Sequence, residues 1–171
     1  MKHSLEFSRP VDVLRLGPEG ISYDIAASAD ERAALARRFD LLALDRLSAR
    51  VTLTPVAGGF YRLAATLEAT LTQACVATLE PVASRIEDRF SLLYGALDAQ
   101  REVVLDGESE TVEPLEGGMI DIGEAVAQQL SLAIDPFPRA PEAPAQAEAA
   151  VPQPLDSPFA VLAKLRASRE G

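Results

Sequence analysis

A long run of alternating apolar and polar residues limits the fold of this chain more than any other feature. Leu63, Ala65, Leu67, Ala69 and Leu71 alternate with small or polar residues without a break. Successive side chains of a β-strand point to opposite faces, so a period of two predicts a strand with one buried and one solvated face. Such strands are typical of antiparallel sheets that cover a core on one side only.

The neighbouring segments extend this pattern into a sheet. Residues 44–56 alternate in the same way, and the segment AGGF predicts a hairpin between them and a long strand over 61–79. We also predict an edge strand over 4–16 and further strands over 21–28 and 84–94. Residues 102–123 are polar and acidic, and we expect a loop there that holds at most one brief strand.

Two segments have the spacing of amphipathic helices. Ser28 or Asp30 is a suitable N-cap for the first, over 29–44, whose apolar face includes Leu42. The second covers 120–134, where apolar residues recur at helical spacing. Helices and strands therefore both contribute, and the pattern predicts an α+β protein.

The composition changes toward the C-terminus. Seven of the twelve prolines lie between residues 136 and 158, mixed with Ala, Gln and Glu, which is typical of an extended linker. We predict a single α+β domain over 1–135, a Pro/Ala-rich linker over 136–157 and a docking helix over 158–171. The domain would hold a mostly antiparallel sheet of five to seven strands, open or partly closed into a barrel. One helix is inserted early, and two lie near the C-terminus, the last beyond the linker.

The net charge of −10 is distributed unevenly along the chain. Residues 1–60 hold eight basic and eight acidic residues, whereas residues 101–150 hold two basic and eleven acidic residues. Sequence-independent binding to nucleic acid depends on Lys and Arg, so the acidic stretch points to a basic partner instead. A solvated loop is the alternative reading. The candidate contact residues in this stretch are Glu108, Glu110, Glu113 and Glu116.

The end of the chain, SPFAVLAKLR, predicts a short helix with one apolar stripe made of Phe159, Leu162 and Leu165. A tethered amphipathic helix can fold back onto the sheet of its own chain. It can equally insert into a groove on another protein. The residues leave both uses open.

Few residues in this chain suit catalysis or metal binding. Cys75 is the only cysteine and His3 the only histidine, which excludes the usual four-ligand zinc sites. A Cys–His pair or a serine triad would have to use His3, near the N-terminus. Counting along the predicted strand places Cys75 on the core side, where we expect it to be a buried structural residue. We therefore expect neither an enzyme nor a cofactor.

The same cysteine content bears on the cellular location. One cysteine cannot form an internal disulfide, and no apolar run approaches the ~18 residues of a membrane helix. The start of the chain lacks the apolar core of a signal peptide. These features indicate a cytoplasmic protein.

Three segments together resemble a known family. They are TQACVATLEPV (72–82), IDIGEAVAQQLSLAIDPFPRAP (120–141) and SPFAVLAKLR (157–166), and their order and spacing resemble the YceD family in its alphaproteobacterial form. The resemblance implies a cytoplasmic, non-enzymatic role in accumulation or processing of large-subunit ribosomal RNA, and so in ribosome assembly. It also implies a ribosomal protein or a large-subunit assembly intermediate as partner.

This chain departs from the family at one position. Many members place two cysteines three residues apart in the first segment, whereas here the second position is Thr78. A metal or redox role that needs both cysteines therefore cannot operate in this chain. The departure agrees with a structural role for Cys75.

Two modes of action remain open. In the first, the acidic stretch and the terminal helix contact proteins or a pre-ribosomal particle, and naked RNA is bound weakly. In the second, the chain binds RNA directly through a basic patch on its N-terminal half. The alternative for this patch is a solvated helix face, because its arginines alternate with acidic residues along the sequence. The candidate patch consists of Arg32, Arg37, Arg38, Arg46 and Arg50.

Overall fold

A computed structural model describes residues 5–95, 102–105 and 108–142 of the chain. Residues 1–140 form one unit. Its strands are β1 (Pro10–Asp12), β2 (Ile21–Ala26), β3 (Ala43–Val56), β4 (Phe60–Ala74), β5 (Pro81–Gly95), β6 (Glu102–Leu105), β7 (Glu108–Pro114) and β8 (Met119–Asp121). The helices are a 3₁₀ turn over Val13–Arg15, α1 (Ala29–Arg38) and α2 (Ile122–Ala133).

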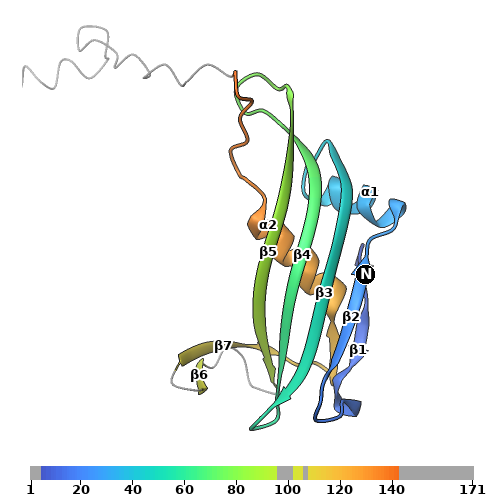
Figure 1. The fold of residues 1–171 in the computed structure, drawn as a ribbon, viewed down its shortest axis with the longest axis vertical. Helices are drawn as coiled ribbons and strands as arrows, with labels where there is room; N and C mark the ends of the chain where they lie inside the picture. Colours follow the sequence, from blue (N-terminus) through green and yellow to red (C-terminus); the bar gives the residue numbers. More distant parts are fainter. Residues whose placement is uncertain (1–4, 96–101, 106–107, 143–171) are drawn as a thin grey trace, which may run out of the picture. The chain divides into compact units, whose positions relative to one another are not determined.

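Most of these strands form one open sheet (Figure 1). Its strand order is β2-β3-β4-β5-β7-β6, and every pair is antiparallel except β5 with β7. In the described ranges the end strands β2 and β6 do not pair with each other, so the sheet is not closed into a barrel. Strands β1 and β8 form a separate antiparallel pair. The mostly antiparallel α+β architecture is therefore confirmed, and the barrel alternative is not.

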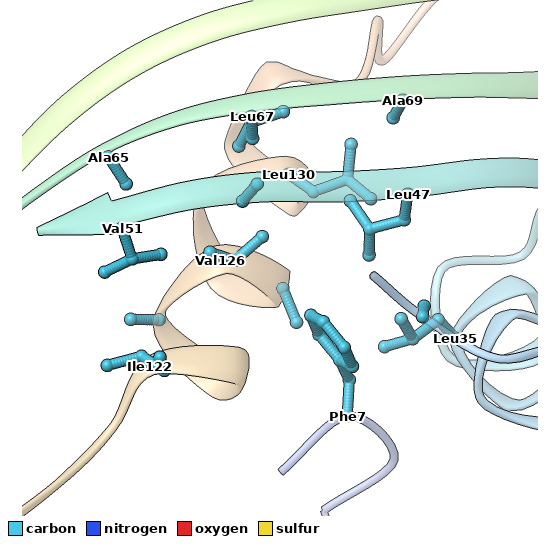
Figure 2. Close-up of a cluster of buried hydrophobic side chains, with 14 of the residues drawn as sticks. Phe7, Leu35, Leu47, Val51, Ala65, Leu67, Ala69, Ile122, Val126 and Leu130 are labelled. Carbon is cyan, nitrogen blue, oxygen red and sulfur yellow. The ribbon is translucent and has the colours of Figure 1, made fainter. Parts of the chain in front are cut away.

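The core lies on one face of the sheet, beneath α2. Figure 1 shows α2 crossing β3, β4 and β5 obliquely. Figure 2 shows Ile122, Val126 and Leu130 of α2 directed toward apolar side chains of β3 and β4. The predicted apolar faces of these strands are confirmed, because all their members are buried: Leu47, Ala49, Val51, Leu53, Leu63, Ala65, Leu67, Ala69 and Leu71. Burial of one leucine side chain stabilises a fold by about 2 kcal/mol, so this layer holds α2 on the sheet.

The β3–β4 hairpin forms as predicted. Gly58 and Gly59 have φ angles of 85° and 81°, a backbone conformation that glycine adopts without strain. The two strands pair along most of their length, with one bulge between Leu44 and Arg46. The bulge allows both Leu44 and Leu47 to be buried on the core side.

Three predicted boundaries are wrong. The first strand is not 4–16 but only Pro10–Asp12, and it pairs with β8 rather than with the large sheet. The first helix ends at Arg38 rather than at 44, because Asp40 has a φ of 55° that interrupts it, which leaves Leu42 exposed. The long strand ends at Ala74 rather than at 79.

The acidic stretch is also more ordered than predicted. Instead of a loop with at most one brief strand, residues 102–123 hold β6, β7 and β8. β7 joins the edge of β5 in parallel through three residue pairs. Residues 136–142 of the predicted linker are described, whereas the rest of the linker and the terminal helix lie outside the described residues, so the three domain boundaries stay a prediction.

The N-terminal segment is tied to the start of α2 by one carboxylate. Asp121 is the N-cap of α2 and accepts hydrogen bonds from the backbone N–H groups of Gly123 and Glu124 at 3.1 and 3.0 Å. The same carboxylate accepts the backbone N–H of Arg9 at 2.7 Å and the hydroxyl of Ser8. One side chain thereby satisfies the helix terminus and fixes a strand more than a hundred residues earlier.

A second contact ties the same segment to α1. The Arg9 guanidinium donates two hydrogen bonds to the Glu31 carboxylate, at 2.7 and 3.0 Å. Glu31 also accepts the backbone N–H of Ser28 and completes a capping box at the start of α1. These donors, with Arg9 the strongest, lower the pKa of Glu31 to about 2.

Glu31→Gln is therefore expected to reduce stability in a pH-dependent way. At pH 7 we expect a loss of about 1 kcal/mol, because solvent screens a pair in which the Arg9 side chain is 36% exposed. Glutamine retains the capping geometry, so the loss reports the charge. The difference in the free energy of unfolding between the wild type and Glu31→Gln should disappear as pH falls from about 4.3, the usual glutamate pKa, toward 2.

Urea unfolding at pH 7, 4 and 2.5 measures this difference in the free energy of unfolding. Glu19→Gln, in an exposed turn, is the matched control and should show no difference at any pH. A difference for Glu31→Gln that stays constant between pH 7 and 2.5 would contradict the assignment to the Arg9 pair.

Candidate functional site

The face of the sheet opposite α2, here called the outer face, is polar and uncovered by any described helix. In Figure 1 α2 passes behind β3, β4 and β5, so this face is turned toward the reader. The strand register places alternate residues of β2, β3, β4 and β5 on it. Its charged residues are Asp24, Arg46, Arg50, Arg62, Glu68, Arg85, Glu87 and Arg89.

Hydroxyl groups occupy most of the remaining positions of the outer face. The Ser22 and Thr52 hydroxyls lie 2.9 Å apart across the β2–β3 pair. Threonine is favoured on a pleated, half-exposed surface, which explains why these strands tolerate so many polar residues. The hydroxyl residues are Ser22, Ser48, Thr52, Thr54, Thr66, Thr70, Thr72 and Ser91.

The charged residues of the outer face pair across strands. Arg50 donates to Asp24 at 2.7 and 3.2 Å, and this contact lowers the pKa of Asp24. Glu68 lies between Arg46 and Arg85, at 3.6 and 3.8 Å. These side chains are more than two-fifths exposed, so each pair contributes little to stability and can exchange for another partner.

The turn after β4 surrounds Cys75, which is fully buried. Its sulfur accepts the backbone N–H groups of Ala77 and Ala140, both at 3.4 Å. A hydrogen bond with the Thr78 hydroxyl and these two amides lower the pKa of the Cys75 thiol to about 6, against the opposing effect of burial. Thr78, at the second position of the motif, lies in the same turn, where its hydroxyl donates to the Glu80 carboxylate at 3.1 Å.

This turn brings together two segments that lie far apart in the sequence. The backbone N–H of Val76 donates to the carbonyl of Pro138 at 2.9 Å, and the Gln73 amide donates to the carbonyl of Asp135 at 2.8 Å. Residues 135–140 therefore run against the end of the β4–β5 hairpin. Cys75 lies between the two segments and outside the main hydrophobic cluster beneath α2, and its structural role stays a prediction.

The structure does not bring the five predicted N-terminal arginines into one patch. Arg46 and Arg50 lie on the outer face. Arg38, in contrast, donates to Glu124 of α2 at 2.8 and 2.9 Å and to Glu6, so it lies on the core side. Arg32 donates to the carbonyl of Ala27 at the start of α1, and Arg37 is in the last turn of that helix.

The acidic candidates lie in or next to β7. Glu108, Glu110 and Glu113 belong to this strand, and Glu116 is in the turn before β8. The side chains of Glu113 and Glu116 are exposed. The helical candidates Phe159, Leu162 and Leu165 fall outside the described residues.

The prediction of candidate arginines missed three members of the outer face, Arg62, Arg85 and Arg89. The strand prediction for residues 84–94 rests on the alternation of Ile86, Asp88, Phe90 and Leu92. The intervening positions, Arg85, Glu87 and Arg89, have the same period of two and could have been placed on the opposite face. Their alignment with Thr66, Glu68 and Thr70 required the register of β4 and β5.

The described residues contain no group of three or more His, Cys, Asp or Glu side chains that could hold a metal ion. None of the helices within them is long and apolar enough to cross a membrane.

Comparison with known proteins identifies a matching family. The model of the family described as large ribosomal RNA subunit accumulation protein YceD matches residues 63–166, more than half of the chain. The matched region begins in β4 and includes the Cys75 turn, β5 and α2. No curated protein and no solved structure matches the chain.

Proposed function

This chain belongs to the YceD family of large ribosomal RNA subunit accumulation proteins, and from that membership we propose that it binds a precursor of the large ribosomal subunit without catalysing a reaction. Its partner there is a ribosomal protein or the ribosomal RNA within the particle. Binding would protect or position the RNA during assembly in the cytoplasm, and so raise the amount that accumulates.

The outer face is the observation that carries this proposal. A typical catalytic site is a concave, mostly apolar pocket with a few convergent polar groups. The outer face has the opposite character: it is broad, polar and exposed over four neighbouring strands. A hollow on it is lined by Asp24, Arg46, Arg50 and Glu68, whose charges already pair with partners on this face. Such a surface suits binding to a large partner.

The other candidate contacts fit the same proposal. The exposed carboxylates of Glu113 and Glu116 would attract a basic ribosomal protein. The predicted terminal helix, with Phe159, Leu162 and Leu165, would dock into a groove on the particle and hold the chain there. These two contacts would act together with the sheet rather than replace it.

Sedimentation of the tagged, full-length protein from its own cells tests the proposal. We expect co-migration with large-subunit precursors in a sucrose gradient, and a shift toward the top of the gradient when residues 157–171 are deleted. A deletion of residues 168–171 alone, which retains the apolar stripe, is the matched control. Sedimentation only as a free small protein, with no ribosomal component enriched, would contradict the proposal.

A further inference from the structure

The outer face carries positive charge although the chain as a whole is acidic. Over strands β2 to β5, five arginines and three carboxylates lie on it, a net charge of +2 in a chain of net charge −10. A surface of this sign attracts a polyanion at short range.

Four of these arginines have a regular arrangement. Arg46 and Arg50 lie four residues apart on β3, and Arg85 and Arg89 lie four residues apart on β5, with β4 between the two strands. From the geometry of a sheet, the four Cα positions mark a rectangle of about 13 Å along the strands and about 10 Å across them. A guanidinium group can bind two oxygens of one phosphate at once, so the rectangle presents up to four phosphate contacts on one face of the sheet.

Hydroxyl groups fill the space inside and around this rectangle. Thr66 and Thr70 of β4 lie between the two arginine pairs, directly opposite Arg89 and Arg85 in the register. A hydroxyl both donates and accepts hydrogen bonds, as the ribose 2′-hydroxyl does. Double-stranded RNA displays its 2′-hydroxyls in a wide, shallow groove, and proteins recognise it through these groups and the phosphates. A sheet surface with this chemistry offers partners for both groups.

The positions of the aromatic side chains indicate a duplex rather than a single strand as the ligand. Proteins that bind single strands without sequence preference stack bases on exposed aromatic rings. Here Tyr23, Tyr61, Phe90 and Tyr94 pack against the core. On the described outer face the aromatic residue is Phe60, at one end, where its ring lies against Gly95. The middle of the face therefore offers no stacking platform.

We infer that the outer face binds the backbone of double-stranded RNA, with Arg46, Arg50, Arg85 and Arg89 on phosphates and Thr66 and Thr70 at the ribose hydroxyls. This inference rests on the proposed function and names its partner: a helical segment of the large-subunit RNA. The exposed carboxylates Asp24, Glu68 and Glu87 exchange their arginine partners for phosphate on binding. Arg89 is the most available, because its guanidinium forms no ion pair within the described part of the chain.

Fluorescence anisotropy with a labelled RNA duplex of about 20 base pairs tests this inference on the full-length protein. We expect Arg50→Ala/Arg89→Ala to weaken binding at least tenfold and to reduce the slope of log affinity against log salt by about two. The matched control, Arg32→Ala/Arg37→Ala on α1, should stay within twofold of the wild type. Both substituted outer-face arginines are exposed, and thermal melts monitored by circular dichroism verify that each variant folds.

Several results would overturn the inference. These are an absence of binding at 50 mM salt, equal loss in the α1 variant, tighter binding to single-stranded RNA, or equal affinity for a DNA duplex or heparin. Failure here is distinguishable from failure of the proposed function. A protein that binds no duplex but still sediments with large-subunit precursors retains its ribosomal role through another surface.

Discussion

Replacing Asp121 with alanine is expected to lower the free energy of unfolding by about 3 kcal/mol, because one partly buried carboxylate is shared by four donors. It caps α2 through Gly123 and Glu124, and it holds the backbone of Arg9 and the hydroxyl of Ser8. A cap alone is worth about 1 kcal/mol, and the rest comes from the long-range bonds. Urea unfolding measures the loss.

Two variants make this prediction specific. Asp121→Asn retains a good N-cap but removes the charge, so its loss should be about half as large. Asp12→Ala is the matched control, because Asp12 is half-buried and its contacts are local: it caps the 3₁₀ turn through the N–H of Leu14 at 3.1 Å and pairs with Arg15 at 3.0 Å. It should cost less than about 1 kcal/mol. Equal losses at positions 12 and 121 would contradict the role of Asp121 as a long-range anchor.

Replacing Gly123 with alanine is expected to destabilise the fold by about 2–3 kcal/mol, although alanine is the better helix former. A Cβ at this position would meet the backbone carbonyl oxygen of Phe7 (Figure 2 shows this residue below α2) and lie 3.2 Å from the Arg9 side chain. The gain in helix propensity is about 1 kcal/mol, and the displacement of the N-terminal segment outweighs it. Differential scanning calorimetry should show a lower melting temperature.

Gly17→Ala is the matched control for this substitution. Nothing lies within 4 Å of a Cβ built on Gly17. Its stability should stay within about 0.5 kcal/mol of the wild type or rise slightly, since alanine restricts the unfolded chain. A Gly123→Ala variant that is as stable as Gly17→Ala would show that the backbone approach of Phe7 is not tight.

The long strands could be predicted from sequence because one period governs each of them. In β3 and β4 every second side chain is buried on the face that carries α2, so the alternation of Leu47 to Leu53 and of Leu63 to Leu71 fixes both the strands and their inner faces. The start of α1 could be predicted for a similar reason. The capping box of Ser28 and Glu31 is a local signal.

The remaining elements depend on contacts that no local pattern reveals. β1 and β8 are three residues long, and each exists because the other pairs with it across more than a hundred residues. β7 is polar and becomes a strand by joining the edge of β5. The end of α1 depends on the left-handed backbone of Asp40. A glycine there would have predicted this conformation, but an aspartate does not.

Some features of the candidate site could be predicted from the sequence, and others could not. The arginines of the outer face follow from alternation within each strand, but their rectangle requires the register of β3, β4 and β5. The burial of Cys75 agrees with counting along the chain, whereas the segment that covers its sulfur, through Ala140, comes from a stretch assigned to the linker. Distance in sequence, rather than residue type, limited what could be predicted there.

We expect the level of large-subunit RNA in cells to depend on contact through the outer face of this chain. The most direct test is the ratio of large-subunit to small-subunit ribosomal RNA in cells whose only copy is Arg50→Ala/Arg89→Ala, expressed at the wild-type level. We expect a ratio as low as in cells without the protein, and a wild-type ratio for Arg32→Ala/Arg37→Ala. A wild-type ratio in the outer-face variant would contradict this expectation.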